Sequence, residues 1–281
     1  MRPSLFLILC VLAVGALAAG CSAGTDAPLI QQVVVQGYLY ANEPLDSVVL
    51  RHTLVMTDTG TDDRVHGATV TITTGDTTTR LTEIGRGVYR PERTLVPRPG
   101  QVYTLHADWG TAHVTATTSV PTAIRIDSAV AEGHALSLTG MDSVTYPARI
   151  SSLSSPGIHL YWSTVGSGSA TGAAGYALEA LAPRTATDTI IDDLTRSLAD
   201  SNAYGRYRFF VRSMNESVAW IQFTYFGENT LRVLALDQNY QDLVLATYLS
   251  GSQFNNNSLH ITGGLGVFAS AARASMRVYV R

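Results

Sequence analysis

The stretch Gly67-Ala68-Thr69-Val70-Thr71-Ile72-Thr73 decides the fold class of this 281-residue chain. The apolar side chains of Ala68, Val70 and Ile72 would point to one side, and the threonines between them to the other. This period of two marks a strand with one buried face. Gly75-Asp76 follows shortly afterwards and is a turn signal. The stretch therefore predicts a half-buried β-strand that ends in a turn.

Similar segments continue on both sides of this strand. Short strands separated by turns at this spacing are typical of β-sandwiches. The segments Gly87-x-Tyr89 and Pro99-Gly100-x-x-Tyr103-x-Leu105 look like those of transthyretin-like and immunoglobulin-like modules in bacterial envelope proteins. We therefore predict a transthyretin/immunoglobulin-like β-sandwich domain over residues 30–120. Its other strands are expected at residues 33–40, 47–56, 102–107 and 113–120.

Pro121 is the predicted boundary to a second, β-rich domain that covers residues 121–281. Its strands are less regular and contain more aromatic side chains than those of the first domain. The predicted fold class is therefore mainly β, with a sandwich followed by a second β-rich domain. The clearest strands of the second domain are expected at residues 158–162, 206–212, 220–226, 231–236 and 275–280.

One segment of the second domain has a helical period instead. Its apolar residues between Tyr240 and Tyr248 recur at intervals of three and four, which is the spacing of one helix face. Asp237 is placed to cap the start of this helix, and Gly251 to end it. The sequence therefore predicts one short helix within the β-rich domain. In the later stretch Gly263–Phe268, the glycines are expected to allow close backbone approach and Phe268 to fill the core.

The N-terminus has the features of an export signal. Residues 5–19 are an unbroken apolar or small run after Arg2, too short to span a membrane and typical of a signal-peptide core. The run ends in Ala18-Ala19-Gly20-Cys21, which resembles a bacterial lipobox with Ala18 in place of the common leucine. We predict a signal peptide over residues 1–20, cleavage between Gly20 and Cys21, and lipidation of Cys21.

The alternative is an ordinary secretory signal that is cleaved near Ala19 and leaves Cys21 as a free thiol. Acylation explains better why Cys21 is the one cysteine outside the signal, since Cys10 lies inside it. Residues 21–29 are small and polar and would form a lipidated tether. Ser22 stands where an inner-membrane retention signal would place Asp. The expected localisation is therefore the cell outer membrane. The protein would be attached to this membrane through the lipid anchor on Cys21, and labelled palmitate would be incorporated there.

The composition excludes several classes of function. The chain contains no lysine, and its 19 basic residues are all arginine. This excludes a lysine-dependent phosphate loop, a pyridoxal Schiff base and a lysine nucleophile. A formal net charge of −3 argues against nucleic acid as a partner. The 32 threonines, which are β-branched, favour strands instead.

No catalytic or metal-binding motif is evident, so we expect no catalytic residue, no metal and no cofactor. The segment 58–63 has clustered oxygens but not the order of an EF-hand calcium loop. The glycine-rich segment 166–175 lacks the lysine and helix of a phosphate loop. The carboxylates of Asp192, Asp193 and Asp200 are not placed by the sequence across a sugar. The seven histidines are scattered over different expected strands: His52, His66, His106, His113, His134, His159 and His260.

Aromatic residues gather between residues 204 and 226. On alternating strands one set packs inward, and core packing explains most of them. An outward set would form a binding surface for a sugar, a peptide or a partner protein. We therefore keep as a candidate binding surface Tyr204, Tyr207, Trp220 and Tyr225.

The order of these features resembles the domain-of-unknown-function 4249 family of Bacteroidota outer-membrane lipoproteins. The shared features are a lipobox cysteine, an early Gly-Tyr-Leu strand, a transthyretin-like first half, a strand followed by a helix, and a late glycine-rich motif. The family has no assigned reaction, and the resemblance implies an association with TonB-dependent transporters. Here the features lie at Cys21, Gly37-Tyr38-Leu39, residues 87–100, residues 231–248 and Gly263–Phe268.

The expected function is that of a non-catalytic outer-membrane lipoprotein. It would be a binding or accessory subunit of a TonB-dependent transporter system. The first alternative is a structural or adhesive cell-envelope module that displays a surface. The second is a carbohydrate- or peptide-active enzyme, which would require carboxylates or histidines that converge in a deep pocket.

Overall fold

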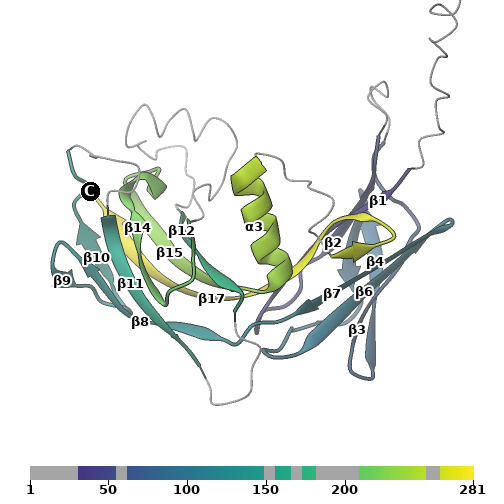
Figure 1. Cartoon of the computed structure of the whole chain (residues 1–281), viewed down its shortest axis with the longest axis horizontal. Coiled ribbons are helices and arrows are strands. Elements are labelled where there is room, and N and C mark those ends of the chain that lie inside the picture. The colour runs from purple at the N-terminus through teal and green to yellow at the C-terminus, as the bar shows by residue number, and fades with distance from the viewer. Residues whose placement is uncertain (1–30, 55–61, 149–155, 166–172, 182–208, 251–259) are drawn as a thin grey trace, which may run out of the picture.

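The computed structural model describes residues 31–54, 62–148, 156–165, 173–181, 209–250 and 260–281. The predicted signal peptide (1–20), the tether (21–29) and the predicted cleavage and lipidation residues Gly20 and Cys21 lie outside these ranges. The prediction of a mainly β fold is confirmed, with one α-helix among the described residues (Figure 1). The helical elements are α3 (Gln238–Ser250) and the short 3-10 helix η1 (Trp220–Gln222). The strands are β1 (Val33–Tyr40), β2 (Val48–His52), β3 (Thr69–Thr74), β4 (Thr77–Gly85), β5 (Val88–Pro91), β6 (Val102–Trp109), β7 (Ala112–Ser119), β8 (Ile124–Ala131), β9 (His134–Ala135), β10 (Met141–Val144), β11 (Pro156–Thr164), β12 (Gly175–Leu181), β13 (Phe209–Val211), β14 (Asn215–Ala219), β15 (Gly227–Leu236), β16 (Ile261–Thr262) and β17 (Leu265–Val280).

The strand predicted around Val70 and Ile72 is β3, and its pattern of buried and exposed side chains is as predicted. Val70 and Ile72 are buried, and the threonines of the strand are partly or fully exposed. β3 pairs antiparallel with β4 on one edge and with β6 on the other. The turn at Gly75 joins β3 to β4, with a φ of 53° at the glycine. The alternation of apolar and polar side chains therefore fixes which face of this part of the sheet is buried.

Two sheets make up the described fold. The larger runs in the order β13-β12-β15-β17-β1-β2-β5-β4-β3-β6-β7-β16, and β10 pairs with β17 off this path. The smaller runs in the order β14-β11-β8-β9. The large sheet curls at both ends, so the molecule has two lobes, with α3 standing between them (Figure 1).

The last strand, β17, belongs to both lobes. Its first residues, from Leu265 to Ala271, pair parallel with β1. Its later residues, from Ala271 to Val280, pair antiparallel with β15, and the last of them also with β10. In Figure 1 this strand (yellow) passes from one lobe to the other. A 16-residue strand is long enough, at about 3.3 Å per residue, to serve both lobes.

The predicted boundary at Pro121 does not separate two independent cores. One hydrophobic cluster contains Val35 and Leu39 of β1 together with Ile158 and Leu160 of β11. The expectation that residues 30–120 form a sandwich of their own is therefore corrected: β16 and β17, from the end of the chain, complete its sheet. The physical reason is that β1 would otherwise leave one edge with unpaired backbone groups.

The predicted helix is confirmed as α3, and its start is fixed by Asp237. The Asp237 carboxylate accepts a hydrogen bond from the backbone N–H of Tyr240 at 2.9 Å, which is the N-cap arrangement. The same carboxylate accepts from the Thr118 hydroxyl of β7 at 2.5 Å and from the Ser270 N–H of β17 at 3.1 Å. The cap therefore joins the helix to β7 and to β17, which are far apart in the chain. Gly251, the predicted end, lies outside the described residues.

The glycine-rich stretch at the start of β17 has the structural role expected of it. Gly266 has a φ of 103°, and a Cβ there would lie 2.0 Å from the carbonyl oxygen of Val35. Phe268 is fully buried and packs against Gly37, where a Cβ would lie 3.0 Å from its ring. The two backbones approach so closely that only glycine fits.

No described helix is both long enough and apolar enough to cross a membrane.

Candidate functional site

A groove of 1390 Å³ opens at one end of the lobe that contains β3 and β4. Its lining comes from the turn between β3 and β4 with the first residues of β4, from the segment 93–99 and from the start of β6. The groove is lined by side chains that include Thr74, Thr77, Thr79, Arg93, Arg98 and Tyr103.

The lining of the groove is held in place by Tyr103. Its side chain is 1% exposed, and its hydroxyl donates to the Gln101 side chain at 2.9 Å. The same hydroxyl accepts from the backbone N–H of Arg98 at 2.9 Å. Asn42, after β1, fixes the segment 93–99, since its N–H donates to the carbonyl of Pro97 at 2.7 Å. The groove is therefore built on fixed backbone rather than on a free loop.

The groove carries an unbalanced positive charge. Arg93 and Arg98 are both exposed, and within the described part of the chain neither guanidinium has a hydrogen bond or an ion pair. No carboxylate is among the described residues that line the groove. The neighbouring Glu92 is engaged elsewhere: it accepts from Thr82 at 2.8 Å and lies 3.7 Å from the Arg80 guanidinium. The described lining therefore offers two positively charged guanidinium donors and no carboxylate that could accept from them.

Little in the sequence predicts this groove. Pro97-Arg98-Pro99-Gly100 predicts only a turn, and Arg93 stands in a segment without periodicity. The two arginines and the threonines of β4 are brought together by the pairing of β3 with β6. The available signal was one arginine inside a proline-rich turn, Arg98, and another five residues before it, Arg93.

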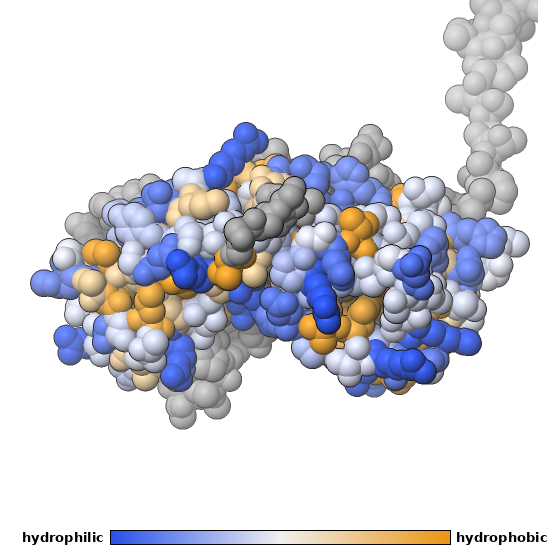
Figure 2. All heavy atoms as spheres, turned by 90° about the horizontal axis from the view of Figure 1, so that it is seen from below, coloured by the Kyte–Doolittle hydropathy of each residue, from blue (hydrophilic) through white to orange (hydrophobic). Residues whose placement is uncertain are grey.

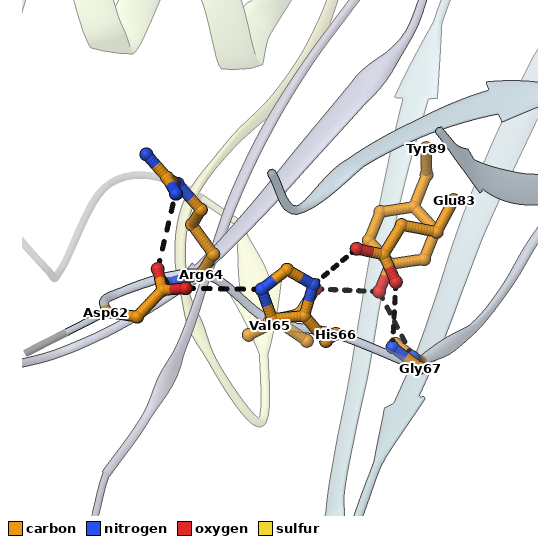
Figure 3. A network of polar contacts seen from close by, with 8 residues as sticks. Asp62, Arg64, Val65, His66, Gly67, Glu83 and Tyr89 are labelled. Carbon is orange, nitrogen blue, oxygen red and sulfur yellow. Dashed lines mark hydrogen bonds and ion pairs between the residues drawn. The ribbon is translucent and has the colours of Figure 1, made fainter. Parts of the chain in front are cut away.

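A second polar cluster lies at the far end of β4 and is shown in Figure 3. The His66 ring lies between two carboxylates, with Nδ1 2.5 Å from Glu83 and Nε2 3.3 Å from Asp62. Arg64 is paired with Asp62 at 3.6 Å. These contacts tie the segment before β3 to the later part of β4.

The Tyr89 hydroxyl of β5 completes this cluster. It donates to the carbonyl of Val65 at 2.8 Å and accepts from the N–H of Ala68 at 3.1 Å. The N–H of Gly67 donates to Glu83 at 2.9 Å. The hydrogen bonds that Glu83 and Tyr89 make with the backbone of residues 65–68 hold this segment in place, so the cluster has a structural role (Figure 3).

The charges of the cluster reinforce one another. Hydrogen bonds to Glu83 and then to Asp62 raise the pKa of His66 above its ordinary value. The N–H of Gly67 lowers the pKa of Glu83, and the N–H of Arg64 lowers that of Asp62. All three side chains lie at the surface, so water and salt screen these effects.

Replacing His66 with glutamine is expected to remove a pH-dependent part of the stability. A raised histidine pKa stabilises the fold below the unfolded value and is lost as pH rises through the folded value. The lowered carboxylate pKa values stabilise the fold above their unfolded values and are lost as pH falls. The deficit of His66→Gln in thermal unfolding should therefore be largest between pH 4.5 and 6.5, the ordinary values for Glu and His.

The matched control is His134→Gln, since His134 is exposed on β9 and has no polar partner in the described residues. It removes an imidazole without removing a polar contact of the described residues, so it should unfold near the temperature of the original chain. A difference of equal size at pH 5.5 and pH 9 for His66→Gln would contradict the proposed protonation.

The predicted aromatic surface is corrected where the structure describes it. Trp220 and Tyr225 are 7% and 9% exposed, so they belong to the core. Trp220 packs edge-on against Tyr146, with ring centroids 5.4 Å apart. The physical reason is that η1 turns inward after β14, and its Gln222 side chain donates to the carbonyl of Leu178 in β12. Tyr204 and Tyr207, the other two residues, lie outside the described residues.

Exposed hydrophobic side chains lie elsewhere. On the face shown in Figure 2 the hydrophobic residues (orange) form separate patches among hydrophilic ones (blue), on both lobes. The large hydrophobic side chains that are exposed among the described residues are Leu54, Ile84, Val96, Val102, Met141, Tyr161, Val165, Met214 and Tyr279.

The other candidates of the sequence stay apart in the fold. His113 and His260 each contact one carboxylate, of Asp108 at 2.7 Å and of Asp242 at 2.8 Å. His52 stacks on Trp109, with ring centroids 5.6 Å apart. The described residues contain no group of three or more His, Cys, Asp or Glu side chains able to hold a metal ion. Much of the segments 58–63 and 166–175, and all of Asp192, Asp193 and Asp200, lie outside the described residues.

Comparison with protein families identifies the chain. The family described as Domain of unknown function (DUF4249) matches residues 26–277. The chain belongs to the DUF4249 family. The match covers both lobes and β17 except its last three residues, so nearly all of the two-lobed sheet lies within the DUF4249 region. It also confirms the family to which the order of sequence features points.

Other comparisons add little about the DUF4249 chain. Comparison with curated proteins yields no match. Among solved structures, the chain is similar to the Yersinia pseudotuberculosis adhesin InvE, at 15% identity and a TM-score of 0.20. That similarity covers 72% of this chain and 54% of the adhesin chain, so the DUF4249 chain spans about half the length of that protein. A TM-score this low carries no argument about fold or function.

Proposed function

We propose that this DUF4249 protein is a non-catalytic binding protein. It is exported as a Bacteroidota lipoprotein, anchored in the outer membrane through Cys21, and serves as an accessory subunit of a TonB-dependent transporter system. The observation that carries the proposal is the groove between the β3–β4 turn and the segment 93–99.

The chemistry of the groove favours binding over turnover. Its lining offers threonine hydroxyls and two guanidinium groups, which hold a ligand through hydrogen bonds. General acid–base chemistry needs a group that exchanges protons near neutral pH, most often histidine or a carboxylate. The described lining contains neither, and it contains no cysteine. The groove can therefore retain a ligand but offers no group of this kind to transform it.

The position of the groove suits a tethered protein. β1 starts at Val33, twelve residues after Cys21, and the groove includes Asn42 just beyond the other end of β1. An eight-residue strand is about 26 Å long. The groove therefore lies at the end of β1 opposite to the end from which the chain leads back to Cys21.

Replacing Cys21 with alanine is expected to abolish lipid attachment. Only a thiol at the cleavage site can carry the acyl chains, so labelled palmitate should no longer be incorporated and the protein should leave the membrane fraction. The matched control is Cys10→Ala, because Cys10 lies inside the predicted signal and is removed with it. Membrane partition of Cys21→Ala equal to that of the original chain would overturn the anchoring proposal.

The transporter partnership is tested by mild detergent extraction from the native host. The lipidated, affinity-tagged chain should co-purify with a TonB-dependent transporter in a fixed ratio. Recovery of the chain alone, or with surface proteins of other classes only, would support a structural or adhesive envelope module instead.

A further inference from the structure

We infer that the groove binds an acidic oligosaccharide, whose carboxylate or sulfate groups contact Arg93 and Arg98. The inference rests on the proposed binding function and names the ligand class for that same groove. It is carried by the residues that line the groove and by the pairing of the strands around it.

The charge of the groove selects an anion. Guanidinium groups form bidentate, charge-assisted hydrogen bonds with carboxylate and sulfate oxygens. Arg93 and Arg98 flank the same opening without a partner in the described residues, whereas the nearby Arg80 and Arg90 are paired with Glu92 and Asp46. Two unpaired guanidinium groups beside one groove suit a ligand that carries more than one negative charge.

The rest of the lining matches sugar rings. Thr77 and Thr79 lie two residues apart on β4, about 7 Å along the strand, and point to the same side of the sheet. Their hydroxyls both donate and accept hydrogen bonds, as sugar hydroxyls require. Val96 and Val102, which are 39% and 50% exposed, offer apolar contacts to the C–H faces of the rings.

The paired strand edges argue against an extended peptide. β3 is hydrogen-bonded to β4 on one side and to β6 on the other, and β4 also pairs with β5. A peptide that adds a strand needs a free edge, and neither strand beside the groove offers one. The ligand is therefore recognised by side chains. The volume of 1390 Å³ exceeds the usual 300–1,000 Å³ of small-molecule sites, which favours an oligomer over a single sugar.

The test measures binding by titration calorimetry with the full-length lipidated chain in detergent. The probes are tetragalacturonate, which carries carboxylates, a sulfated galactose tetrasaccharide, and neutral galactotetraose. At least one acidic probe should bind, and the neutral one should bind at least about tenfold more weakly. The two acidic probes distinguish the sources of the negative charge. Raising the ionic strength from about 0.1 M to about 1 M should weaken binding, because the Debye length falls from about 10 Å to about 3 Å.

The variants locate the site. Arg93→Gln and Arg98→Gln should each weaken the acidic probe about tenfold, since each removes one charge-assisted contact. The control Arg86→Gln makes the same charge change at an exposed turn residue at the far end of β4, outside the groove, and should leave affinity unchanged. Because both groove arginines are exposed, the variants should unfold at the temperature of the original chain.

The outcomes separate this inference from the proposed function. Tighter binding of the neutral probe, or equal loss in Arg86→Gln and Arg93→Gln, would overturn the acidic-ligand inference and leave the binding function standing. Absence of binding to all three probes, with the transporter still co-purified, would also overturn the inference alone. Absence of both binding and co-purification would overturn the two together.

Discussion

Replacing Gly266 with alanine is expected to destabilise the fold by about 4 kcal/mol, the sum of backbone strain and steric overlap. Gly266 has a φ of 103°, which side chains rarely adopt. The added Cβ would lie 2.0 Å from the carbonyl oxygen of Val35 and 2.8 Å from its nitrogen. Because Val35 and Gly266 are partners in the parallel ladder, β1 would have to move away from β17. Urea unfolding with two spectroscopic probes measures the loss.

The control for this prediction is Gly110→Ala. Gly110 also has a positive φ, 59°, but nothing lies within 4 Å of a Cβ there. Its substitution should cost only the backbone term, about 1–2 kcal/mol. Equal losses for the two variants would show that the close approach of β1 and β17 contributes nothing to stability.

Replacing Asp237 with alanine is expected to cost about 3 kcal/mol, from one lost helix cap and buried donors left without an acceptor. Asp237 is 6% exposed and accepts from Thr118, Tyr240 and Ser270. The hydroxyl oxygens of Thr118 and Ser270 are themselves 2.7 Å apart, so both strands lose part of one network. Chemical unfolding should show the loss, and hydrogen exchange should show faster opening of α3.

Asp237→Asn is the conservative companion of this variant, because asparagine also caps helices well. It should lose less than half as much stability. Burial raises the pKa of Asp237, and the hydrogen bond from Thr118 opposes that rise. A raised acid pKa means that stability falls as pH rises from the unfolded value through the folded value. Asp237→Asn should remove that fall, and an unchanged pH profile would contradict the assignment.

The local elements of this protein follow from its sequence. The alternation around Val70 and Ile72 predicts a strand with one buried face, and the structure has it as β3. The spacing after Asp237 predicts a helix, and α3 starts there with the expected cap. The glycines before Phe268 predict close backbone approach, which Gly266 shows. The strand and the helix depend on neighbours within a few residues, so periodicity and residue type suffice to predict them. Residue type also predicts that the backbone is approached closely at Gly266, but not that Val35 is the neighbour.

The long-range arrangement was decided by the tertiary structure. No local signal indicates that β17 pairs with β1, which lies more than two hundred residues earlier in the chain. For this reason the domain boundary predicted at Pro121 divides residues that share one hydrophobic core. Burial of Trp220 and Tyr225 has the same origin, since an amphipathic ring suits either a core or a surface and its surroundings decide between them. The candidate groove needs the ends of β3, β4 and β6 to meet the segment 93–99. By itself the sequence predicted many of the strands and the helix, but the strand expected at residues 220–226 is wrong, since η1 begins there. The expected export signal lies outside the described residues and stays a prediction. Which strands pair, and therefore where Arg93 and Arg98 stand together, depends on contacts between residues far apart in the chain, and local periodicity carries no information about these.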